Sequence, residues 1–528
     1  MSMSWGRTMM AIAISMLTTY ATSSLLSFFF VVLETDLNAG PTKLGLIVMC
    51  NRMVNAVAGV VWGWAADESP RIRLWIWASL GGALPTMILA ASANYAMFLI
   101  VYASAAIGWS ALKSVALSLV PDLYIPDERG KAMGSLGIAI ICAAVLGVAV
   151  ATAFQNPVGG VDGWRLAHLL LGLLQIPTVL IVRWLAQDPP RGSKEFSDAL
   201  AYAVAPEYAS VVPSAAGIEA RLSASEEEQA EEGEEGEGEA AGAGRTGKGG
   251  VRAGLADLVA NSIPILRNRG FNLFMALLTA QALPVSALSF MVLWFQYSGL
   301  SELGAGVAYT LAAIGSIVGS GVGGWVGDVV SRRLPNRGRL MVAQLAVLCN
   351  MGLLVVLLVV VPKTSYALIA LVMFFIGLLL SIPAFASDLP NSAEVVPKAL
   401  RGLAYALQGL VQGTVSSTGS LLVGAIAEGW FGYRERTGEL DDVPREDKIH
   451  NRDALSKACL VVFLSCWSLQ FVLYFVAYSV YPRVRDEIRA ADGGDEVNEV
   501  GSRSRSGSET SSSWDESTGT ATSGSRSR

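Results

Sequence analysis

Gly63-Trp64-Ala65-Ala66-Asp67 ends one long apolar run, and Gly324-Trp325-Val326-Gly327-Asp328 ends a second run in the other half of the chain. Paired arginines follow each stretch, at Arg71 and Arg73 and at Arg332 and Arg333. A second motif with an Arg-Gly step comes next in both places, at Arg129-Gly130 and at Arg401-Gly402. Two motifs that recur in one order indicate a duplicated unit. The sequence therefore predicts two related halves with matching loops.

The composition is typical of a membrane protein. Of the 528 residues, 52% are hydrophobic and 16% are charged, whereas soluble domains carry about 25% charged residues. The apolar residues form continuous runs, and about 20 apolar residues cross a bilayer as a helix. Lipid offers no partner to exposed backbone groups, so continuous runs favour helices over barrel strands. We expect an all-α membrane protein with twelve transmembrane helices, at residues 9–33, 44–66, 74–93, 95–119, 132–154, 166–187, 271–297, 303–327, 339–361, 365–388, 402–427 and 455–481.

Four segments follow from this division. Residues 1–187 form an N-terminal six-helix bundle and residues 271–482 a C-terminal six-helix bundle, which we expect to be pseudo-symmetric. Residues 188–270 contain the run EEEQAEEGEEGEGE, whose like charges cannot bury a core, so this linker is predicted to be disordered. Residues 483–528 are rich in Ser, Gly and Arg and are predicted to be a disordered tail.

The distribution of basic residues predicts the orientation in the membrane. Lys and Arg are frequent in the loops after the second, fourth, eighth and tenth spans and sparse in most of the others. Positive residues stay on the cytoplasmic side, so both termini and the linker are expected in the cytoplasm. The loop before the last span is also basic, but it is long and contains many acidic residues, and we give it less weight.

Several classes of function are disfavoured. The chain has five cysteines without a CxxC pair and two histidines, so we expect no metal, no cofactor and no catalytic site. No basic patch of the kind that binds nucleic acid is present. The expected partners are the lipid bilayer and a small-molecule solute, handled by a monomeric transport unit.

The G-W-x-x-D motif with its arginines resembles the hallmark loop of the major facilitator superfamily, over nearly all of residues 9–480. The segments DGWRLAHLLLGLL (162–174), LPVSALSFMVLWFQYSGL (283–300) and GDVVSRRLPNRGRLMVAQ (327–344) are similar to a branch related to the Spinster-like transporters. The resemblance implies two bundles that rock about a central cavity lined by helices 1, 4, 7 and 10. The paired motifs would then form a latch between moving parts, or alternatively a static loop staple.

The sequence departs from this family pattern at several places, two of which concern residues linked to proton coupling. The fourth-helix arginine common in proton-coupled members is replaced by Tyr102, and the first-helix acid of Spinster-like relatives is replaced within Tyr20–Ser24. We also find no Asp or Glu deep in any predicted span. Because proton coupling usually needs such a carboxylate, we expect a facilitator or an exchanger rather than a proton symporter.

Polar residues within the spans are the candidates for a solute cavity. A charged group in mid-membrane costs about 2.5–3.5 kcal/mol on insertion scales, so Arg52 and Lys113 are interpreted as cavity cations suited to carboxylate or phosphate groups. Pairing with carbonyls or with the first-helix acids is the alternative. The uncharged candidates, each equally able to form an interhelical hydrogen bond, are Tyr20, Thr22, Asn55, Tyr102, Gln281, Gln408 and Gln412.

A glycine ridge marks the eighth span. Gly315, Gly319, Gly323 and Gly327 recur every four residues, which predicts close packing of a neighbouring helix. Together the observations predict a secondary transporter of a small organic solute, either an organic anion or a lysolipid-like amphiphile. A receptor or scaffold that keeps this fold without moving solute is the alternative.

Overall fold

The structure is a computed structural model that describes residues 2–124, 126–189, 262–362, 365–397, 400–435, 440 and 443–509. Most of the predicted linker, residues 190–261, and the end of the predicted tail, residues 510–528, lie outside the described residues. All the regular elements described are helical, apart from one isolated β-bridge between Val158 and Val161.

The N-terminal half contains seven helices before the linker. Their bounds are α1 (Ser2–Phe28), α2 (Phe30–Asp36), α3 (Pro41–Glu68), α4 (Arg71–Leu89), α5 (Tyr95–Leu123), α6 (Pro126–Ala153) and α7 (Gly163–Leu185). The first predicted span is divided between α1 and α2, which are separated by Phe29. Pro41 starts α3 at the first turn, where the missing N–H has no intrahelical partner to lose.

The C-terminal half repeats this pattern with more interruptions. Its elements are α11 (Arg269–Ala287), α12 (Ser289–Tyr297), α13 (Glu302–Arg333), α14 (Gly338–Val355), η2 (Val356–Val360), α15 (Tyr366–Pro383), η3 (Ala384–Asp388), α16 (Leu389–Glu394), α17 (Arg401–Gly429) and α18 (Arg445–Glu509). The elements η2 and η3 are single π-helical turns. Asn268 and Ser301 cap α11 and α13 by accepting hydrogen bonds from Phe271 N (3.1 Å) and Gly304 N (3.2 Å).

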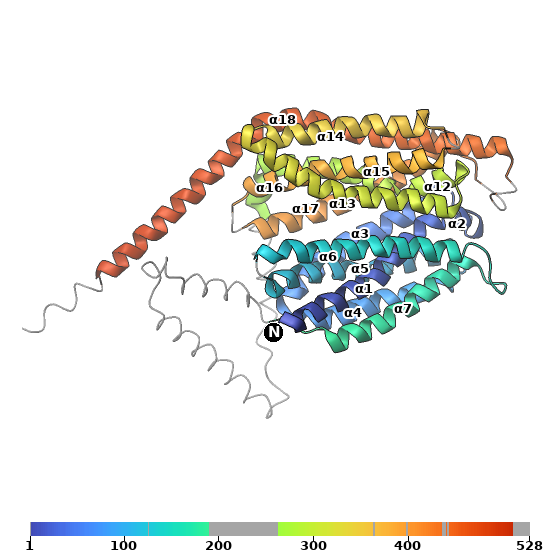
Figure 1. Ribbon diagram of the computed structural model, residues 1–528, viewed down its shortest axis with the longest axis horizontal. Coiled ribbons are helices and arrows are strands. Elements are labelled where there is room, and N and C mark those ends of the chain that lie inside the picture. The colour runs from blue at the N-terminus through green and yellow to red at the C-terminus, as the bar shows by residue number, and fades with distance from the viewer. Residues whose placement is uncertain are drawn as a thin grey trace, which may run out of the picture.

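The predicted twelve-span, all-α architecture is confirmed. Eleven of the described helical segments are long and apolar enough to cross a membrane, and the shorter apolar stretch Ile138–Ala153 of α6 occupies the remaining position. Figure 1 shows the C-terminal half lying above the N-terminal half, with the long axes of the helices roughly parallel. The chain start and the projecting end of α18 lie at the left-hand end of this view, which we call the near end.

The last helix extends past the predicted start of the tail at residue 483. The helix α18 continues to Glu509, whereas the sequence predicted disorder from residue 483 onward. The prediction placed the boundary where the apolar run stops, but the helix continues beyond that position. Beyond it, Arg485 anchors the helix by donating to Asn336 Oδ1 (2.9 Å).

The two halves meet through four pairs of helices among the described elements: α3 with α17, α6 with α13, α1 with α12, and α2 with α12. At the closest of these contacts, a glycine of one helix faces backbone atoms of the other helix. A Cβ atom added at Gly45 would lie 2.6 Å from Ser420 O, and one added at Gly424 would collide with Pro41 O. Towards the middle of the same helices, a Cβ on Gly413 would lie 2.6 Å from Ala56 Cβ. The α3–α17 contact therefore extends from the end opposite the near end, which we call the far end, to about the middle.

The glycine ridge of α13 lies against α15 and η3. All four ridge glycines are buried. A Cβ on Gly319 would collide with the carbonyl oxygen of Leu378, and one on Gly327 would lie 2.7 Å from Ala386 O. Backbone atoms cannot swing aside as side-chain ends can, so these positions admit no larger residue without moving a helix.

Replacing Gly319 by alanine should lower stability through this collision. Overpacking of this kind costs about 1–3 kcal/mol, so we expect the thermal midpoint of the purified Gly319→Ala protein to fall. Gly321→Ala on the same helix is the matched control, because nothing lies within 4 Å of its added Cβ. Equal midpoints for the two variants would contradict the close approach.

Candidate functional site

Arg52 lies at the centre of the candidate site. It is on α3, about 16 Å along the helix from Pro41 at the rise of an α-helix. The residue is exposed, and the groups nearest to its charge come from both halves of the molecule. An exposed cation at the interface between the halves is a candidate for contact with a solute. Among the described residues, the groups that act electrostatically on its guanidinium are Tyr102 on α5 and Tyr309 on α13.

The two tyrosines come from different halves and are held by other aromatic rings. The ring of Tyr102 stacks on Phe98 with centroids 5.9 Å apart and meets Trp109 edge-on at 5.6 Å. The ring of Tyr309 meets Phe28 edge-on at 6.0 Å. Such ring pairs stabilise one orientation of each tyrosine. The guanidinium therefore sits between the halves, beside a preorganised aromatic wall.

Several of the other predicted cavity residues form hydrogen bonds between helices. Thr22 accepts from Gln175 Nε2 on α7 at 3.1 Å, and Gln412 donates to Leu278 O on α11 at 3.3 Å. Gln281 donates to Leu380 O on α15. These contacts match the alternative that the sequence left open for such residues. Tyr20 and Asn55 are both half-buried.

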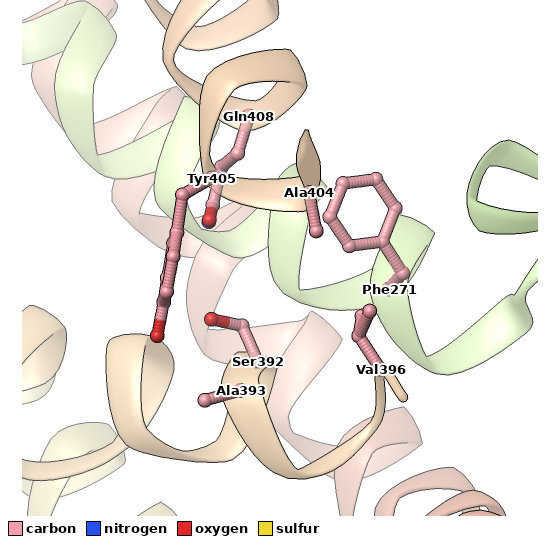
Figure 2. Close-up of a pocket in the computed structure, with 7 residues that line it drawn as sticks. All are labelled: Phe271, Ser392, Ala393, Val396, Ala404, Tyr405 and Gln408. Carbon is pink, nitrogen blue, oxygen red and sulfur yellow. The ribbon is translucent and has the colours of Figure 1, made fainter. Parts of the chain in front are cut away.

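Gln408 lines a small pocket near the start of α17. Figure 2 shows Gln408 and Tyr405 of α17 on one side, with Phe271 of α11 and Ser392 of α16 facing them. The side chains leave essentially no enclosed space for even a water molecule, whereas pockets for organic ligands span about 300–1,000 Å³. The pocket is therefore too small to hold the whole of an organic solute. Its wall is completed by Ala393, Val396 and Ala404.

Arg71 ties together three helix ends at the near end of the N-terminal half. Its guanidinium pairs with Asp122 at the end of α5 and, at 3.0 Å, with Asp188 after α7. It also donates to Ser118 O (3.0 Å) and Pro189 O (2.7 Å), and its side chain is only 4% exposed. Arg73, two residues later, is exposed. Of the two arginines in the first loop motif, Arg71 thus holds helix ends together and Arg73 does not.

Arg339 joins helix ends in the C-terminal half, as Arg71 does in the N-terminal half. It pairs with Asp328 at the end of α13 (2.7 Å) and with Glu394 of α16 (3.3 Å), and Glu394 accepts from the hydroxyl of Tyr481 (3.0 Å). Arg332 and Arg333, which the sequence motif had predicted for this role, are exposed. Sequence reasoning missed Asp122, Asp188, Arg339 and Glu394. The signal for Asp122 and Glu394 was their position shortly after the first proline of the second repeated motif.

These ion pairs join helices of the same half. In the described parts of the chain, no ion pair connects the two halves at the near end. The side chains of Asp67, Lys113, Arg129 and Arg401 lie outside the described part, so their predicted roles remain predictions. A Cβ on Gly63 or Gly324 would meet nothing within 4 Å, so neither glycine marks a close approach.

At the far end a buried carboxylate closes the interface between the halves. Glu34 of α2 is 2% exposed and accepts from the hydroxyls of Tyr433 (2.9 Å) and Tyr297 (3.3 Å), both of the C-terminal half. The two hydroxyl oxygens lie 2.8 Å apart. Close by, Glu428 accepts from the backbone N (2.9 Å) and the hydroxyl of Thr42. The structure is thus a state in which polar contacts seal the far end.

A carboxyl group also lies inside the tenth apolar segment, six residues from its end, where the sequence analysis expected no Asp or Glu deep in a span. Asp388 is completely buried at the end of η3, inside the apolar segment Tyr366–Glu394. The sequence analysis ended this span at residue 388 and so placed Asp388 at its edge. The π-helical turn and α16 extend the segment by six residues, which brings the carboxyl group inside.

Removal of Arg71 should destabilise the protein strongly, because it leaves two carboxylates facing each other in a partly buried site. Breaking such a pair costs about 3–5 kcal/mol, and we expect the Arg71→Ala protein to unfold at a clearly lower temperature. Arg73→Ala is the control and should change the free energy of unfolding by less than about 0.5 kcal/mol. A similar fall in the unfolding temperature of both variants would show that the two arginines act through net charge alone.

Loss of the Tyr433 hydroxyl should open the far end. A hydrogen bond to a charged group contributes about 1.5–3 kcal/mol, so Tyr433→Phe should shift the population away from the sealed state. Spin labels at Val158→Cys and Arg445→Cys, in a cysteine-free background, would report this as longer distances. Tyr95→Phe removes a hydroxyl that bonds Lys43 O within one half and should leave the distances unchanged. Unchanged distances in Tyr433→Phe would contradict this role.

Comparison with known proteins identifies the fold. The family model described as Major Facilitator Superfamily matches residues 12–420. A bacterial homologue of the human lysosomal transporter Spinster, solved in inward-facing occupied and unoccupied conformations, aligns with TM-scores of 0.67 and 0.68 at 14% identity. These alignments cover 90% and 91% of this chain and 97% and 98% of those chains.

A more distant likeness extends to other solute carriers. A D-xylose-proton symporter aligns with a TM-score of 0.52 at 14% identity, over 87% of this chain and 97% of that chain. At such identities these likenesses show a shared fold, and the family match covers more than half of the chain. The chain belongs to the Major Facilitator Superfamily and has the architecture of a membrane transporter rather than an enzyme.

Proposed function

We propose that the chain is a secondary transporter that moves a small organic anion with an apolar body by alternating access. The observation that supports this most directly is the environment of Arg52. The residue is exposed, and its guanidinium lies between the halves with a tyrosine of each half beside it. A planar guanidinium can hold a carboxylate or a phosphate by two parallel hydrogen bonds.

The charge balance around Arg52 favours an anionic solute. A cation deep in a membrane protein is costly unless a partner or water compensates it. Within the described residues, the groups acting on Arg52 are two neutral hydroxyls and no carboxylate. An incoming anion would supply the missing negative charge, while Tyr102 and Tyr309 would contact its apolar part. Organic anions and lysolipid-like amphiphiles share this chemistry.

The positions of the contacts support a rocking mechanism. The bonds and close packing between the halves lie at the far end, at Glu34, at Thr42 and along α3 and α17. Each half has its own ion-pair cluster at the near end and can therefore move as a unit. If basic loops stay in the cytoplasm, the near end is cytoplasmic, and the structure corresponds to an inward-facing state.

Arg52→Gln tests the proposal, because glutamine keeps a polar side chain and removes the charge. We expect a single-chain anionic phospholipid or an aromatic carboxylate to raise the melting temperature of the wild-type protein, since a ligand of the native state stabilises it. The variant should bind about 10- to 100-fold more weakly, the equivalent of one charged hydrogen bond. Arg52→Lys should retain part of the affinity.

The same probes separate the remaining possibilities. Stabilisation by the phospholipid alone would identify an amphiphile carrier, and stabilisation by the carboxylate alone would identify a carrier of soluble anions. A neutral sugar that stabilises wild type and Arg52→Gln equally would contradict the anionic solute. Binding without counterflow of the bound anion in proteoliposomes would favour the receptor or scaffold over the transporter.

A further inference from the structure

Asp388 is buried in a part of the molecule that the proposed anion site does not use. It belongs to η3, which packs against the ridge helix α13 and against α14, α15, α16 and α11. The hydroxyl of Tyr474 on α18 lies 2.9 Å from both oxygens of its carboxyl group. Ser387 and Gln470 are its other polar neighbours. Among the described residues, the carboxyl group thus has neutral partners only.

The charged and titratable groups of the surrounding elements are engaged elsewhere. Asp328 of α13 and Glu394 of α16 are held by Arg339 of α14. On α18, Tyr478 donates to Gln344 Oε1 (2.8 Å), and Tyr481 donates to Glu394. Among the described residues no charged group acts on the Asp388 carboxyl. An ionised carboxylate buried without a cation costs several kcal/mol, so this environment suits the neutral acid.

The polar groups around Asp388 are incompletely bonded. Both amide atoms of Gln470 and Oδ1 of Asn391 are buried without a hydrogen-bond partner among the described residues. Asn391 uses its Nδ2 to donate to Ser387 Oγ (3.2 Å). More than about 90% of buried polar atoms in proteins are paired, and groups left in this condition are places where water or a bound species enters. Gln470 lies close to the carboxyl group without reaching hydrogen-bond geometry with it.

The local backbone allows this environment to change. A π-helical turn is a common feature of functional sites within helices, and η3 places Asp388 at its last position. The turn is also pressed against the glycine ridge, where a Cβ on Gly327 would lie 2.7 Å from Ala386 O. Movement of α13 relative to α15 would therefore act directly on the segment that carries Asp388.

We propose that Asp388 is a proton-exchange site of the C-terminal half. In the state described, the carboxyl group carries a proton and is held by Tyr474. When η3 shifts and water reaches the site, the O–H bond of the acid breaks, the proton passes to water, and the carboxylate remains. No oxidant or reductant is involved. The inference goes beyond the proposed anion site, because it does not depend on which solute Arg52 attracts.

Infrared difference spectroscopy on the full chain in lipid nanodiscs tests the site directly. We expect a carbonyl band of a protonated carboxylic acid at about pH 5, where exposed aspartic acids are already ionised. The band should disappear as the pH is raised to about 9. The band should be missing in Asp388→Asn, which keeps the size and the hydrogen bonding of the side chain. Asp388→Glu should retain a band at a shifted position, and Tyr474→Phe should move the titration midpoint.

Three outcomes would overturn the proposal. One is a wild-type spectrum without a protonated-acid band at any pH, which would make Asp388 a permanently ionised structural residue. Another is a band that does not change across the pH range. The third is stabilisation of the wild-type protein by sodium chloride over choline chloride, absent in Asp388→Asn, which would assign the oxygen atoms of the site to a sodium ion. The shifted band of Asp388→Glu assigns the signal independently of Asp388→Asn, so one misfolded substitution would not prevent the decision.

Discussion

The contact between α3 and α17 is the constraint on which the remaining geometry depends. Gly45, Gly413 and Gly424 let these two helices approach backbone to backbone from the far end to about the middle of the membrane. Close packing of small residues is what drives association of helices in lipid, where apolar side chains gain little by leaving the solvent. Arg52 of α3 lies about one helical turn from Ala56, which Gly413 approaches, so this contact holds the cation at the interface between the halves. A tighter or longer contact would bury this cation without access to any solute.

The two near-end clusters explain why the halves can move as units. Arg71 and Arg339 each pair with two carboxylates at or near helix ends of their own half, and neither reaches the other half. The pairs of Arg71 are largely buried, and those of Arg339 are partly exposed; such pairs contribute modestly to net stability but fix the arrangement of the groups that form them. They therefore keep the ends of each bundle together when the interface between bundles changes. Between described residues, the polar contacts across the interface lie at the far end, around Glu34 and Glu428.

The fold was predictable from the sequence because bilayer length and the duplicated motif are strong, local signals. The twelve spans, the two halves and the unusual cation Arg52 all follow from the pattern of residues along the chain. The pairing of Arg339 with Asp328 does not, because it depends on how the loop after α13 returns, and Arg332 and Arg333 are nearer in sequence. The sequence also seemed to exclude a deep carboxylate, because a run of apolar residues gives no sign that a π-helical turn carries Asp388 inward. Both errors concern tertiary geometry that residue spacing does not encode.

One helix connects the two sites of opposite charge. Tyr309, which neighbours Arg52, and Gly327, which presses on η3, both belong to α13. The 18 residues between them span about 27 Å at the rise of an α-helix. Coupling over such a distance requires an element with two arrangements that both sites influence, and a rigid helix with a glycine ridge can slide along α15 without losing its packing. An anion that draws Tyr309 towards Arg52 would move the same helix that confines Asp388. Solute charge and proton occupancy would then be linked through the position of α13, although the two groups never touch.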